Sequence, residues 1–150
     1  MTVALNGNIK TLNTLNEINE ILVLFNDSFP RPLSERIDFS EYAAKLFENA
    51  VVKVIYENGE IAGFIAYYCN DSGTKAAFLT QIAVTECKKK KGFGGILLDD
   101  CISHCIDEKM DSIICEVDNN NENAISFYRK KGFVFHSTAS DKSQFLIKKL

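Results

Sequence analysis

The sequence lacks several features that mark whole classes of protein. No apolar run approaches the roughly 18 residues that a membrane-spanning helix needs, and the best candidate, residues 61–69, is far shorter. The first ten residues, MTVALNGNIK, have neither the basic start nor the long apolar stretch of a signal peptide. There is no internal repeat and no low-complexity tract. We therefore expect a cytoplasmic protein with no membrane partner.

The cysteines also lack the spacing of a metal site or a redox motif. Five are present, and no two of them form a C-x-x-C pair. Cys101 and Cys105 are one helical turn apart, but His104 between them falls on another face of a helix. We predict that no metal binds and interpret most of the cysteines as small buried hydrophobes in a reducing compartment.

Strong positive charge is missing as well. The formal net charge is −3, with 25% charged and 46% hydrophobic residues among 150. Nucleic-acid-binding domains usually carry a basic balance and a broad basic face, whereas here the lysines form one local island. We expect no nucleic acid as partner. The length predicts a single domain over residues 1–150.

The hydrophobic pattern along the chain predicts a mixed α/β domain. Apolar spacing indicates helices over residues 11–29 and 34–48, and Asn58-Gly59 indicates the turn of a hairpin over 50–69. The nearly continuous apolar run 76–84 predicts a strand buried on both faces. A helix starting between Gly92 and Gly95, a strand over 111–117, a helix over 121–132 ended by Gly132 and a closing hairpin complete the order. The apolar stripe of the third helix is Leu97, Leu98, Cys101, Ile102, Cys105 and Ile106.

The loop CKKKKGFGG, residues 87–95, joins a strand to a helix. Backbone N–H groups at a helix start bind anions, glycines let the backbone come close, and lysines add positive charge. A solvated lysine turn is the plain alternative, which the glycines make less attractive. A Walker loop would end in Gly-Lys-Ser/Thr, and here the lysines come first. The dinucleotide fingerprint fits weakly, because Leu97 takes its third glycine position although Glu116 could serve as its acid.

Two motifs resemble those of the GCN5-related N-acetyltransferase (GNAT) family. VTECKKKKGFGGILL, residues 84–98, is similar to the family's cofactor motif, with Lys89 in the Arg/Gln place and Glu86 where proline is usual. NENAISFYRKKGF, residues 121–133, is similar to the motif N-x-x-A-x-x-F/L-Y-x-x-x-G-F. The resemblance is good from about residue 76 to 135. Before that, only the order of elements agrees.

The resemblance implies a GNAT-like fold whose central mixed sheet is splayed between strands 4 and 5, with helices on both faces. It implies acetyl-CoA as cosubstrate, with the pyrophosphate on the loop amides and the pantetheine arm paired to the preceding strand. Asn121 would contact the pantetheine or simply cap its helix. The implied cofactor-binding residues are Ile82, Ala83, Val84, Lys89, Lys90, Lys91, Gly92, Phe93, Gly94, Gly95, Asn121 and Tyr128.

The implied reaction is direct attack of a primary amine on the thioester in a ternary complex. Tyr128 matches the motif tyrosine and is the candidate acid for the departing thiolate, with a packing aromatic as the alternative. Glu116 lies in an apolar strand, where burial would raise its pKa, and its spacing to Tyr128 resembles that in ribosomal-protein N-acetyltransferases. It is the candidate base. A solvent-side strand residue and a water chain remain alternatives, because Thr80 and Gln81 offer no base.

The acceptor is not encoded in a recognisable motif. A small-molecule amine and a protein N-terminus both stay open, and Arg31 and Arg36 flank a loop that would meet it. A homodimer is compatible with the sequence. Two rival functions are a non-catalytic acyl-CoA-binding or sensing domain and an RNA-binding module that uses the lysines.

Overall fold

The computed structural model describes residues 8–28 and 38–150. Within them the strands form one mixed sheet in the order β1-β2-β3-β4-β5-β7-β6. Strand β4 (Ala76–Val84) pairs in parallel with β5 (Ser112–Asp118), and this register covers only Ala76–Leu79 against Ser112–Cys115. Pairing that stops partway along both strands is what a splay between strands 4 and 5 requires. The predicted α/β fold class is therefore confirmed.

The chain divides into two compact units, Met1–Tyr67 with Gln81–Asp100 and Tyr68–Thr80 with Cys101–Leu150. Strand β4 and helix α4 (Phe93–Asp107) each run from one unit into the other. The single-domain assignment of the sequence stays a prediction.

The first unit opens with strand β1 (Ile9–Thr11), which pairs antiparallel with β2 (Val51–Glu57). The sequence predicted a helix from residue 11, but α2 spans Leu15–Leu24 and is followed by a short 3₁₀ turn, η1 (Asn26–Ser28). Thr14 delays the start because its hydroxyl caps the helix, accepting a hydrogen bond from Glu17 N at 3.1 Å.

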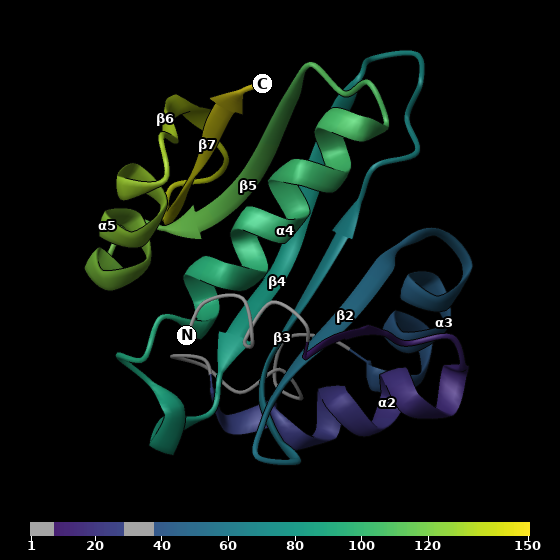
Figure 1. Ribbon diagram of the computed structural model, residues 1–150. Coiled ribbons are helices and arrows are strands. Elements are labelled where there is room, and N and C mark those ends of the chain that lie inside the picture. The colour runs from purple at the N-terminus through teal and green to yellow at the C-terminus, as the bar shows by residue number, and fades with distance from the viewer. Residues whose placement is uncertain (1–7, 29–37) are drawn as a thin grey trace. The chain divides into compact units, whose positions relative to one another are not determined.

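Helix α3 (Phe39–Asn49) begins after Asp38, whose carboxylate accepts from Glu41 N. Its predicted first residues, 34–37, lie outside the described part of the chain, as do Arg31 and Arg36. Helices α2 and α3 lie side by side (Figure 1). Their buried faces join the β2–β3 hairpin in the core of this unit, where the rings of Phe25 and Phe64 are 4.9 Å apart.

The β2–β3 hairpin is confirmed, with β3 spanning Glu60–Tyr68. Asn58 and Gly59 have φ of 52° and 80°, the left-handed values that a tight primed turn needs. Strand β4 has its predicted bounds but not its predicted burial. Ala77 and Leu79 are buried, whereas residues 80–84 are only half-buried.

The second unit contains β5, helix α5 (Glu122–Lys130) and the antiparallel hairpin of β6 (Val134–Thr138) and β7 (Ser143–Lys149). Strand β7 also pairs antiparallel with β5. These elements have the predicted order and closely match the predicted bounds. The apolar stripe of α4 is confirmed in part: Leu97, Leu98, Cys101 and Cys105 are buried, but Ile102 is half-buried and Ile106 is 52% exposed.

Candidate functional site

The strand-to-helix loop belongs to the first unit and is tied to the hairpin at its start. Thr85, the residue after β4, donates its N–H to Ala62 O at 2.9 Å, and its hydroxyl donates to the same oxygen at 3.4 Å. A 3₁₀ turn, η3 (Glu86–Lys88), follows. The chain then passes through left-handed backbone at Lys90 (φ 66°) and Gly92 (φ 89°) before α4 begins.

The first turn of α4 presents main-chain amides. Its first helical hydrogen bond runs from Ile96 N to Gly92 O at 3.1 Å. The amides of Phe93, Gly94 and Gly95 precede this bond, so they have no acceptor inside the helix. The side chain of Phe93 is buried and holds the helix start in the core of the unit. This arrangement suits an anion, because N–H groups without helical acceptors lie at the positive end of the helix dipole.

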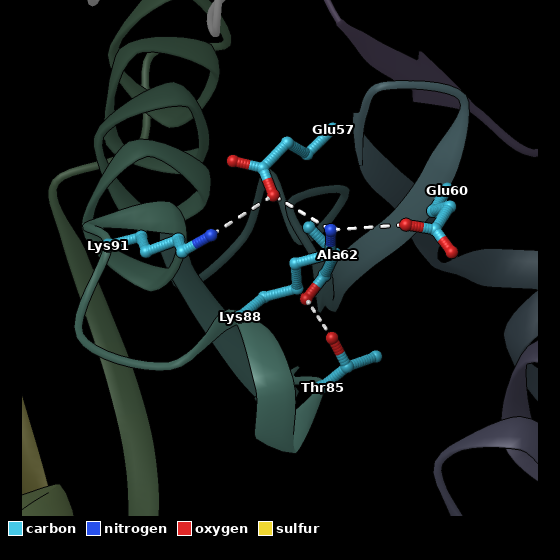
Figure 2. A network of polar contacts seen from close by, with 6 residues as sticks. All are labelled: Glu57, Glu60, Ala62, Thr85, Lys88 and Lys91. Atoms are coloured by element: carbon cyan, nitrogen blue, oxygen red, sulfur yellow. Dashed lines mark hydrogen bonds and ion pairs between the residues drawn. The ribbon is translucent and has the colours of Figure 1, made fainter.

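The lysines of the loop are largely neutralised by nearby carboxylates (Figure 2). Lys88 Nζ lies 2.8 Å from Glu57 Oε1 and 3.3 Å from Glu60 Oε1, while Lys91 Nζ lies 3.4 Å from Glu57 Oε1. Lys89 pairs with Glu86 inside the loop at 2.9 Å. Of the four loop lysines at positions 88–91, Lys90 alone forms no ion pair with a residue that the structure describes. Most of the positive charge that the lysines add to the loop is thus paired with carboxylates, and the amides are the main candidates for holding an anion.

The end of β4 is in close contact with β3 at a glycine. A Cβ atom on Gly63 would stand 2.8 Å from Ala83 O, 3.3 Å from Leu97 Cδ1 and 3.4 Å from Val84 Cγ2. Only a residue without a side chain fits there without displacing the backbone of Ala83. The segment 82–84, predicted to pair with the pantetheine, is half-buried. Its position therefore depends on the close approach at Gly63.

Tyr128 belongs to the second unit and is fixed by the end of helix α5. Phe133 N donates to Tyr128 O and Gly132 N donates to Arg129 O, both at 3.0 Å. With Gly132 at φ 94°, these bonds form a Schellman motif. The apolar contact that accompanies such a motif is present, because the rings of Tyr128 and Phe133 are 5.2 Å apart. The Tyr128 side chain is therefore held rigidly, and the residue is only 7% exposed.

The Tyr128 hydroxyl lies among buried cysteines. It donates a hydrogen bond to Cys115 on β5, and Cys101 of α4 is a further neighbour. Burial, and then the two cysteines, raise the pKa of Tyr128 far above its usual value. Burial likewise raises the pKa of the Cys115 thiol to about 12. Tyr128 is consequently a neutral phenol throughout the physiological range, as an unperturbed tyrosine would be, and the raised pKa makes it a weaker acid than a free phenol.

Glu116 is not buried, which corrects the expectation from the sequence. The side chains of β5 alternate, so the buried Cys115 and Val117 lie on one face and Glu116, which is exposed, lies on the other. Its carboxylate accepts a hydrogen bond from Ser143 Oγ at 2.6 Å. Tyr128 contacts Cys115, so it packs on one face of β5. The Glu116 side chain points to the opposite face.

Asn121 caps helix α5. Its Oδ1 accepts a hydrogen bond from Ala124 N at 3.2 Å. The capping alternative for this residue is therefore confirmed, and a pantetheine contact stays a prediction. Asn121, Tyr128 and Glu116 all belong to the second unit, whereas the loop and the segment 82–84 belong to the first.

Sequence reasoning missed three residues that shape the site. Glu57 and Glu60 contact Lys88 across 31 and 28 positions of the chain, and Cys115 contacts a tyrosine on another element. Glu57 and Glu60 flank the predicted Asn58-Gly59 turn, so the sequence does indicate that the tip of the hairpin is acidic. It does not indicate that this tip contacts Lys88, because the two segments are far apart in the chain.

No helix in 8–28 or 38–150 has the length and apolar character needed to cross a membrane. Across these same residues, no cluster of three or more His, Cys, Asp or Glu side chains is arranged to hold a metal ion.

Comparison with known proteins identifies the family. The model of the acetyltransferase (GNAT) family matches residues 17–133, so the chain belongs to this family. The match begins far upstream of residue 76, where the motif resemblance started. The α2–α3 region is thus part of the family's common structure and not only similar in its order of elements.

Solved structures share the fold at low sequence identity. Ribosomal-protein-alanine N-acetyltransferase from Brucella melitensis has a TM-score of 0.75 at 19% identity, over 95% of this chain and 99% of that one. PaiA N-acetyltransferase from Thermoplasma acidophilum, in complex with coenzyme A, has a TM-score of 0.74 at 15% identity, over 95% and 99%. Nourseothricin acetyltransferase has a TM-score of 0.62 at 20% identity, over 67% of this chain and 65% of that one.

Proposed function

We propose that the chain is an acetyl-CoA-dependent N-acetyltransferase that moves an acetyl group to a primary amine by direct attack in a ternary complex. Family membership supports acetyl transfer in general. The observation that carries the specific proposal is Tyr128. The motif tyrosine is buried, its backbone takes part in a Schellman motif and its ring packs on Phe133, so the structure gives the proposed acid a defined position.

The cofactor site is proposed from the loop geometry. The amides of residues 89–95 would bind the diphosphate, since those of Phe93, Gly94 and Gly95 have no acceptor in the helix. The N–H of Lys89 would have to leave Glu86 O, to which it donates at 3.4 Å. Backbone groups of Ile82, Ala83 and Val84 would pair with the pantetheine amides, since parallel pairing of β4 to β5 ends at Leu79. In the related PaiA structure coenzyme A is bound, which makes this cofactor class a reasonable choice.

Each catalytic need has a candidate in the chain. Acetyl-CoA supplies the activated thioester. Tyr128 would give its proton to the departing thiolate, and a backbone N–H of segment 82–84 would donate to the carbonyl oxygen as it gains charge. An alkylamine with a pKa of about 10 must lose a proton before it attacks. Glu116 lies on the face of β5 opposite to Tyr128, so it would take that proton through a chain of water molecules.

The acceptor class is left open between small amines and protein N-termini. The related structures include both an alanine N-acetyltransferase of ribosomal protein and a nourseothricin acetyltransferase. At about 20% identity these names do not select a substrate for this chain. A screen of amine pools is therefore part of the test.

The test is a thiol-release assay with acetyl-CoA and pools of amines, run beside calorimetric binding of CoA. We expect amine-dependent release that falls by about 10²–10⁴ in Tyr128→Phe, the usual contribution of a general acid, while CoA affinity is retained. Tyr56→Phe removes a hydroxyl from β2 and should change neither quantity. CoA binding without release for any amine would refute the transferase in favour of an acyl-CoA sensor. Absence of CoA binding would refute both.

A further inference from the structure

Lys88 differs from the other lysines of the loop in how its charge is used. Its side chain is only 12% exposed, and its ammonium group lies between the carboxylates of Glu57 and Glu60 (Figure 2). The side chains of Lys89 and Lys91 are 49% and 51% exposed. An ammonium group already shared by two carboxylates is poorly placed to contact a phosphate as well.

The carboxylates that hold Lys88 flank the turn of the β2–β3 hairpin. Glu57 is the last residue of β2 and Glu60 the first of β3, and the two are paired in the hairpin register. The turn thus brings two carboxylates to one ammonium group, that of Glu57 being 21% exposed and that of Glu60 75% exposed. The loop thereby gains an anchor on the hairpin that is independent of the cofactor.

A second anchor lies three residues earlier. Thr85 is bound through its N–H and its hydroxyl to Ala62 O of the same hairpin. The 3₁₀ turn between the anchors is closed by the bond from Lys88 N to Thr85 O at 2.9 Å. The segment 85–88 is thus fixed at both ends, and the amides of residues 89–95 continue directly from it.

We propose that Lys88 is a positioning residue that fixes the diphosphate-binding loop to the hairpin acids Glu57 and Glu60 and does not itself bind the cofactor. The inference rests on the proposed function, because it assumes that coenzyme A is the ligand of the loop. Lys88 also neutralises Glu57, which would otherwise face an anionic ligand with only Lys91 beside it at 3.4 Å.

Calorimetric titration of CoA into Lys88→Met tests the assignment. The expected rise in Kd is about tenfold, the lower end of what second-shell partners contribute to affinity in metal sites. In the activity assay KM for acetyl-CoA should rise while kcat is nearly unchanged, because Tyr128 lies in the other unit. The control Lys10→Met removes an exposed ion pair with Glu17, 3.4 Å long, and should leave Kd unchanged.

A double-mutant cycle separates positioning from direct contact. In the background Glu57→Gln, Glu60→Gln the hairpin has no acid to hold Lys88, so adding Lys88→Met should change the CoA affinity little further. If Lys88 contacts the phosphates, Lys88→Met would still weaken CoA binding in that background, and the proposal would be overturned. Unchanged affinity in Lys88→Met would also overturn it. Failure of the unmodified protein to bind CoA would instead reject the proposed function.

Discussion

Gly63 offers a sharp test of how the fold places the end of β4. An added Cβ would stand 2.8 Å from Ala83 O, while ordinary contact begins at 3.4 Å, so one backbone must move by roughly half an ångström. Leu97 Cδ1 would also lie 3.3 Å from the added Cβ, so the new methyl group cannot avoid Ala83 O by moving toward Leu97. Overpacking of this kind costs about 1–3 kcal/mol. For a chain of 150 residues, this corresponds to a drop of about 2–12 °C in melting temperature.

The measurement is calorimetric unfolding of Gly63→Ala, with CoA affinity determined on the same sample. Because the displaced atom belongs to the segment proposed to pair with the pantetheine, affinity should fall as well as stability. Gly73→Ala is the matched control, since its new Cβ meets only Asp71 Oδ1 at an ordinary 3.4 Å. A Gly63→Ala protein within about 0.5 kcal/mol of the unmodified one, the range of neutral surface changes, would refute the reasoning.

Two further predictions use the ionisable groups. In thiol labelling at pH 8, the exposed Cys87 should react quickly and Cys115 only after unfolding, because Cys115 is buried and burial raises its pKa to about 12; rapid labelling of Cys115 would contradict this burial. Hydrogen bonding by Lys88 lowers the pKa of Glu57 below its ordinary 4.5, and Glu57 raises the pKa of Lys88 above its ordinary 10.5. The melting-temperature difference between the unmodified protein and Lys88→Met should therefore be constant from about pH 5 to 10 and shrink as pH falls through the folded-state pKa of Glu57 or rises through that of Lys88. A difference that grows in acid would contradict the ion pair.

Local sequence signals predicted most of the secondary structure because their physical causes are local. Asn58-Gly59 demands a primed turn, and Gly132 ends a helix in left-handed backbone, so both positions could be identified without the rest of the fold. Strand β1 was missed for the opposite reason. A strand of three residues is too short to show an alternating hydrophobic pattern. These residues are extended because they pair with residues 53–55 of β2.

The site was predictable where it is made of backbone and much less so where it depends on side chains. The strand, glycines and helix around residue 92 follow from the sequence pattern, and the structure has them in that order. Whether a lysine is uncompensated depends on acids about thirty positions away. Whether Glu116 is buried depends on which face of β5 is covered, and an apolar neighbourhood in sequence does not determine that.

The second family motif can be understood as a way of holding one phenol. Asn121 caps the start of α5 through Ala124 N, and Gly132 with Phe133 closes its end through the carbonyls of Arg129 and Tyr128. The helix is therefore stopped at both ends by residues of the motif itself. Tyr128 is the position at which the Schellman motif accepts its outer hydrogen bond, and it packs on Phe133. A tyrosine one residue earlier or later would have neither constraint, so the spacing of the motif specifies the geometry of the acid that we propose.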